Sequence, residues 1–182
     1  MRTCLFLVLA AASVTASSCK KDDPAAGPTG SNTASCFING VRFVATGWDN
    51  GSILSNPVPP LSGGFSFDSV YVLELNGQFQ GRHTTVLLFL RSQKPGTYEL
   101  NRDTPYYPQG DPRYVLHHAT FRQYDTRGEV SVTDARHTGR IVLTHADVAR
   151  GLSAGTFEFT AVSTFDRTKT ITVTHGYFDR KQ

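Results

Sequence analysis

Apolar and polar side chains alternate with a period of two residues along most of the chain after residue 35. In the segment 156–160, both phenylalanines fall on one face and the polar residues fall on the other. Since successive side chains of a β-strand point to opposite faces, this pattern predicts strands with one buried face. The segments predicted as strands are 36–38, 41–44, 65–79, 84–90, 96–100, 114–124, 129–134, 140–145, 156–162 and 170–178. No segment of useful length has a helical period, so we predict an all-β fold, an antiparallel meander of about nine or ten strands that forms a β-sandwich or a flattened barrel.

Three local signals add detail to this sheet. Asn39 and Gly40 separate two strand segments and predict a tight hairpin, because both residues tolerate a positive φ. The nearly unbroken apolar run 84–90 predicts a central strand that is covered on both faces. In the last segment, Val173 and Phe178 are out of phase, so both can be buried only if the strand bulges near Gly176.

The first 34 residues have a different composition. A basic Arg2, an apolar run over 4–12 and the small residues 16–18 precede Cys19. This order predicts a lipoprotein signal peptide over 1–18, with the mature chain beginning at a lipidated Cys19. The segment 19–34 contains proline, glycine and small polar residues without a large apolar side chain, so we expect a flexible tether from the membrane. Residues 35–182 then form a single β domain.

Two other interpretations of the leader stay open. Ordinary secretory cleavage after Ala16 also fits the small residues 14–16. A membrane-spanning helix needs about 20 apolar residues, and the serines and threonines from Ser13 onward interrupt the run before that length.

The charge distribution and the cysteine content bear on two questions, whether the protein binds nucleic acid and whether it contains a disulfide. The net charge is +3, and the arginines after residue 112 are scattered singly rather than gathered on one element, so we expect no nucleic-acid partner. Cys4 would leave with the signal peptide and Cys19 would carry lipid, which leaves Cys36 without a disulfide partner. A small buried residue at a strand start is the simpler interpretation of Cys36, and a reactive thiol is the alternative.

Four segments of the domain resemble a known family. They are Phe37–Phe43, Pro95–Leu100, Gly155–Ala161 and Ile171–Asp179. Together with the leader, they are similar to a domain of unknown function in Bacteroidota lipoproteins, in which lysine and acidic residues after the lipidated cysteine favour export to the cell surface. The resemblance implies an all-β fold and a lipid-anchored outer-membrane location, with exposure at the cell surface as a further expectation. It transfers no activity.

The most suggestive catalytic motif is G-x-S-x-G over 151–155, with Asp166 and His175 following in the chain order of a hydrolase triad. That mechanism needs the serine on a sharp turn from a strand into a helix. Ser153 instead precedes a segment that alternates as a strand. We therefore predict that the protein is not an enzyme.

Metal and carboxylate chemistry find little support in the sequence. His117 and His118 are adjacent on a strand and would point to opposite faces. We expect no metal site and no cofactor. The sequence brings no two of the strand glutamates together, although a polysaccharide-acting hydrolase with paired carboxylates stays an alternative. These glutamates are Glu74, Glu99, Glu129 and Glu158.

Exposed aromatic residues give the best indication of binding. Tyr106 and Tyr107 lie in a proline-rich loop over 104–112, and Trp48 lies beside another turn. Rigid aromatic side chains can stack on sugars or anchor a protein partner, so these three are candidate ligand-binding residues. The alternative is that the tyrosines fold back and cap an open end of the sheet. The favoured function is a surface-anchored, non-enzymatic lipoprotein that has a structural role or binds an extracellular glycan or an envelope protein. A lipocalin-like carrier of a small apolar ligand is the second hypothesis.

Overall fold

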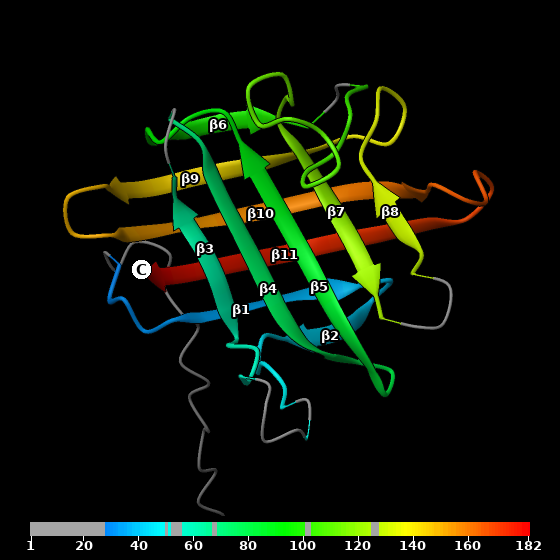
Figure 1. Ribbon diagram of the computed structural model, residues 1–182, viewed down its shortest axis with the longest axis horizontal. Helices are drawn as coiled ribbons and strands as arrows, with labels where there is room; N and C mark the ends of the chain where they lie inside the picture. Colours follow the sequence, from blue (N-terminus) through cyan, green and yellow to red (C-terminus); the bar gives the residue numbers. More distant parts are fainter. Residues whose placement is uncertain (1–27, 50, 52–55, 67–68, 101–102, 125–127) are drawn as a thin grey trace, which may run out of the picture.

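A computed structural model describes residues 28–49, 51, 56–66, 69–100, 103–124 and 128–182 (Figure 1). Within these ranges the protein is all-β, with eleven antiparallel strands and no helix, which confirms the predicted fold class. The strands are β1 (Thr33–Ile38), β2 (Val41–Val44), β3 (Leu61–Phe65), β4 (Tyr71–Phe79), β5 (Arg82–Leu90), β6 (Gly96–Glu99), β7 (His118–Gln123), β8 (Val130–Val132), β9 (Gly139–Asp147), β10 (Leu152–Ser163) and β11 (Thr170–Lys181).

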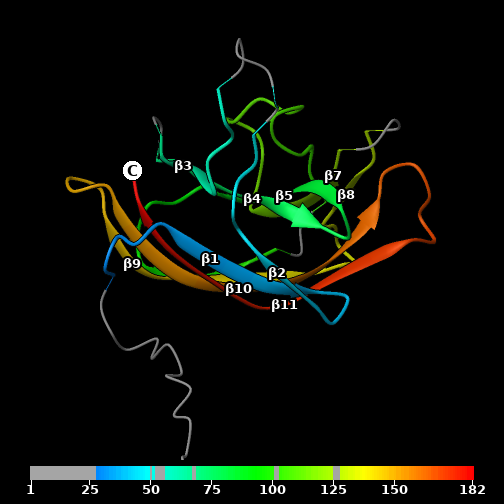
Figure 2. The same ribbon diagram turned by 90° about the horizontal axis from the view of Figure 1, so that it is seen from below.

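The strands form one curled, half-barrel sheet in the order β2-β1-β11-β10-β8-β7-β5-β4-β3. Strand β10 joins its two layers, because its last residues Val162 and Ser163 pair with β8 while its earlier residues pair with β9. Strand β9 pairs with β10 outside this strand order, and β6 pairs with the other edge of β9. Figures 1 and 2 show β3, β4, β5, β7 and β8 as one layer that crosses over the other.

The core lies between these layers and is built from the inward faces of the strands. Phe157 and Phe159 are buried while Glu158 between them is exposed, as the alternation predicts. Tyr71 and Phe178 stack across the interior at 6.2 Å, and Phe178 also contacts Phe157. Each such side chain contributes roughly 1.5–3 kcal/mol by leaving water. All three rings belong to the main hydrophobic core.

The predicted hairpin and bulge are both present. Asn39 and Gly40 have φ values of 48° and 78° and connect β1 to β2. On β10, Phe157 pairs with Gly176 of β11 and Phe159 pairs with Val173. The two β11 partners are three residues apart while the β10 residues are two apart, so β11 contains one extra residue, which is the bulge. A Cβ on Gly176 would lie 2.5 Å from the Phe157 ring, which explains the glycine beside the bulge.

Strand β3 lies almost entirely outside the segments that the alternation predicts. It contains the adjacent glycines Gly63 and Gly64, which have positive φ values of 79° and 141° and are more typical of a turn. A Cβ on Gly63 would lie 2.3 Å from the carbonyl oxygen of Val72 on β4. The strand therefore forms because glycine permits a close approach of two backbones, a tertiary requirement that local periodicity does not reveal.

A second, smaller apolar cluster covers the outward face of β5. Val70, Leu87, Phe89 and Val115 are buried there, with Tyr107 packed against them. The residues from Val86 to Leu90 are all buried, which confirms the prediction of a strand covered on both faces.

The N-terminal segment reaches the domain at the end of β11. Thr29 and Gly30 donate backbone N–H bonds of 2.9 Å to the Asp179 carboxylate, and the hydroxyls of Thr29 and Ser31 donate two more bonds. Burial opposes ionisation of Asp179, but these hydrogen bonds outweigh it and lower its pKa. The predicted signal peptide and Cys19 lie outside the described residues, as does the tether up to residue 27. The described ranges contain no helix with the length and apolar character needed to cross a membrane.

Candidate functional site

Backbone contacts with Val58 and with strand β4 hold the segment around Trp48 in place. Its N–H donates to the Val58 carbonyl at 3.0 Å, and the Val58 N–H donates back at 2.8 Å. The N–H of Gly47 donates to the Asn76 carbonyl on β4. Gly47 has a φ of 66°, and a Cβ there would lie 2.3 Å from the Val58 oxygen, so the approach needs glycine. The indole is therefore carried on a fixed backbone.

Three rings meet around this indole. Trp48 stacks on His83 with ring centroids 4.8 Å apart and an interplanar angle of 9°. The Tyr124 ring meets Trp48 edge-on at 5.6 Å, and the Arg122 guanidinium lies 5.9 Å from the Tyr124 centroid. Tyr124 is 50% exposed, while the other three residues are half-buried. We call Trp48, His83, Tyr124 and Arg122 the Trp48 cluster.

The two candidate tyrosines lie elsewhere. Tyr107 stacks on Phe89 at 5.8 Å, and its N–H donates to Nε2 of His118 at 3.0 Å. Tyr106 is half-buried, and its carbonyl accepts a bond from Gly110. His83 and Phe89 are six residues apart on β5, or about 20 Å in an extended strand. The structure therefore does not bring Trp48 together with the tyrosine loop, and the Tyr107 ring covers the sheet.

His118 connects this loop to the sheet as a neutral imidazole. Its ring is buried and stacks on Phe89 at 4.9 Å. Nε2 accepts the bond from Tyr107, so Nδ1 carries the proton and donates to the Leu116 carbonyl at 2.8 Å. Burial lowers the pKa of His118 to about 4. The geometry gives His118 a structural role.

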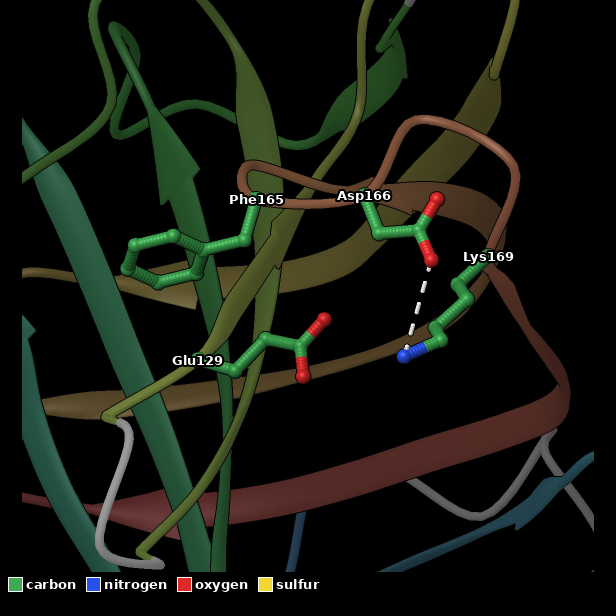
Figure 3. A pocket seen from close by; sticks show the side chains of 4 residues that line it. All are labelled: Glu129, Phe165, Asp166 and Lys169. Atoms are coloured by element: carbon green, nitrogen blue, oxygen red, sulfur yellow. Dashed lines mark ion pairs between the residues drawn. The ribbon is translucent and has the colours of Figure 1, made fainter.

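An open hollow of about 500 Å³ lies at the far end of β10 (Figure 3). It is lined by Glu129, which precedes β8, and by Phe165, Asp166 and Lys169 from the turn between β10 and β11. The Phe165 ring is 73% exposed. The sequence pattern indicated Asp166 only as a possible triad member and did not indicate Phe165. The one local sign of an exposed ring here is that Phe165 stands alone among polar residues in a turn.

Residues 65–180 match a domain of unknown function, DUF6252. This protein belongs to the DUF6252 family. No curated protein and no solved structure matches the chain. The matched DUF6252 region contains the tyrosine loop and the hollow, whereas Trp48 precedes it.

Within the DUF6252 region, the last four residues of the G-x-S-x-G motif begin strand β10, and Gly151 lies in the turn before it. Ser153 lies in β10, is 1% exposed and shares a hydrogen bond of 2.9 Å with the Tyr71 hydroxyl. Asp166 lies in the turn after β10, and His175 lies at the β11 bulge against Phe37. The serine is therefore not on the strand-to-helix turn that the hydrolase mechanism requires.

The histidines and carboxylates of the DUF6252 domain are mostly engaged in local contacts. His137 pairs with Asp134 at 2.8 Å, and Arg167 also contacts this carboxylate. Glu158 pairs with Arg140 at 2.8 Å. In the part of the chain that the structure describes, no group of three or more histidine, cysteine or acidic residues is placed to hold a metal ion.

Cys36 is 1% exposed at the inward face of β1, which confirms the buried interpretation. Burial raises the pKa of its thiol to about 12. A thiol with so high a pKa is almost entirely protonated at neutral pH and is therefore a poor nucleophile.

Proposed function

We propose that this DUF6252 protein is a non-enzymatic binding module, anchored to the bacterial outer membrane through a lipid on Cys19 and exposed at the cell surface. Its ligand is an extracellular glycan, and the Trp48 cluster is the binding surface. The observation that carries the proposal is the stacking of Trp48 on His83 beside the half-exposed Tyr124 ring.

The chemistry of the cluster suits a sugar. Aromatic rings present flat apolar faces that stack on the C–H face of a pyranose, and Arg122 supplies N–H donors at the edge for hydroxyl groups. The Trp48 backbone is held by the bridge to Val58 and its indole stacks on His83, so little conformational entropy is lost when a ligand binds. These features support a preformed platform.

The leader supports the anchor. Signal-like residues precede Cys19, and a segment rich in small polar residues connects it to the domain. The Asp179 contacts hold Thr29–Ser31 against β11, so a tether from Cys19 would join the domain at these residues.

A glycan array followed by titration tests the binding surface. The full chain is expected to retain a glycan, and Trp48→Ala or Tyr124→Ala should lower its affinity about tenfold. Tyr114→Ala is the matched control, because Tyr114 is 73% exposed but lies in the segment between β6 and β7 that also carries Tyr107. Retention of an envelope protein in place of any glycan, or equal affinity for all variants, would contradict the glycan assignment.

Membrane fractionation tests the anchor separately. Cys19→Ser should move the protein from the detergent phase to the aqueous phase, because the acyl chains would be absent. Cys36→Ala is the control for loss of a thiol and should remain in the detergent phase. Unchanged partitioning of Cys19→Ser would refute lipidation.

A further inference from the structure

The hollow beside the β10–β11 turn has a firmly held framework. The Ser163 hydroxyl donates to Oε1 of Glu129 and accepts the backbone N–H bonds of Phe165 and Asp166 at 3.1 and 3.0 Å. Thr164 donates twice to the Val130 carbonyl at the start of β8. The positions of Glu129 and Phe165 are therefore coupled through hydrogen bonds rather than left to a free loop.

Glu129 brings a negative charge to this framework. Its side chain is half-buried, and it forms no ion pair with any residue in the described ranges. Asp166, by contrast, pairs with Lys169 at 3.6 Å and accepts two bonds from Thr168. In the view of Figure 3, the Glu129 carboxylate lies between the Phe165 ring and the Asp166–Lys169 pair.

We propose that the hollow binds an organic cation, with an alkylammonium or guanidinium group held between the Glu129 carboxylate and the Phe165 ring. A carboxylate attracts such a group by charge, and the face of an aromatic ring attracts it through its quadrupole. The volume of about 500 Å³ has room for an alkyl chain as well as the charged group. The cation can be a lysine or arginine side chain of a peptide or a free polyamine.

The hollow shares no residue with the Trp48 cluster and lies far from the tether. Lys169 immediately precedes β11, whereas Asp179, which holds Thr29–Ser31, lies near the other end of that strand. A strand of this length separates the two by about 30 Å. The inference therefore does not depend on the glycan platform or on the anchor.

Amide chemical shifts of the full chain, measured at low ionic strength, test the proposal. The probes are acetyl-arginine amide, acetyl-lysine amide and putrescine, with acetyl-glutamine amide as the neutral control. We expect the cations to shift the amides of 163–169 saturably, with a Kd of about a millimolar, because each contact is weak in solvent. A peptide-type cation that binds more tightly than putrescine indicates a protein partner, and the reverse order indicates a polyamine. Equal shifts with the neutral control would overturn the site.

Variants that should lower the affinity for cations, compared with one that should raise it, separate a binding effect from a structural effect. Glu129→Gln keeps an acceptor for Ser163 but removes the charge, so affinity for cations should fall about fivefold. Phe165→Ala should lower affinity about threefold. Lys169→Gln removes a repelling charge and should raise affinity about twofold. Glu158→Gln, on the outer face of β10, should change nothing. Unchanged affinity in Glu129→Gln, or weaker binding in Lys169→Gln, would refute the proposal.

Discussion

The outward face of β5 carries an aromatic ring stacked on a histidine near each of its ends, and the two pairs differ in burial. Phe89 stacks on His118 at 4.9 Å, and Trp48 stacks on His83 at 4.8 Å. Phe89 and His118 are fully buried under the loop that carries Tyr107, whereas Trp48 and His83 remain half-buried. Nearly the same ring geometry therefore serves as a small core at one end and as an accessible surface at the other. Ring stacking alone does not identify a binding site, and the covering loop makes the difference.

Removing the ring at each end should produce the largest contrast. Phe89→Ala leaves a cavity in the second core and should lower the free energy of unfolding by about 3–5 kcal/mol. Trp48→Ala loses less burial and should cost about 1–2 kcal/mol. Urea denaturation of both variants measures the difference. Equal costs would show that the Trp48 cluster is as structural as the Phe89 pair.

Acid should weaken the covered end through His118. Its pKa is about 4 in the folded protein against an ordinary value of 6.5, so the unfolded chain binds more protons between these values. The stabilisation is complete above pH 6.5 and is lost as the pH falls toward 4, by roughly 3 kcal/mol. Denaturation at pH 7.0 and 4.5 measures the loss, with His118→Gln as the reference that lacks this titration. The same pH dependence in both proteins would contradict the assignment of a neutral buried His118.

The tyrosine at each end should give the smallest contrast. Tyr107→Ala removes a ring packed on Phe89 and should lower stability by about 1–2 kcal/mol. Tyr124→Ala removes a half-exposed ring and should change stability by less than about 0.5 kcal/mol. Thermal unfolding distinguishes the two. A large loss in Tyr124→Ala would assign that ring to the core and remove it from the proposed platform.

Local patterns accounted for much of the sheet. The phenylalanines of β10 were placed on the buried face by alternation, and the Asn39-Gly40 hairpin followed from two residues that accept a positive φ. The bulge beside Gly176 followed from the phase difference between Val173 and Phe178, which are both buried. Strand β3 was the exception, because its paired glycines serve a close contact with β4 rather than a turn.

The binding surfaces were less accessible to sequence reasoning. Trp48 was chosen for its type and its neighbouring turn, but its stacking partner His83 lies on another strand. Tyr107 looked equally suitable and instead packs on Phe89. Glu129 and Phe165 come from different loops, and only the pairing of β8 with the end of β10 brings them to one hollow. Residue type identified aromatic candidates without showing which of them a loop would cover.

By itself, the sequence determined that this chain forms antiparallel strands with one apolar face, because side-chain direction in a strand alternates from residue to residue whatever lies further away. Tertiary structure alone decided how β10 divides between β8 and β9, which rings are covered and which charges meet at the hollow. These outcomes depend on contacts between residues far apart in the chain, and such contacts leave no periodic trace in the sequence.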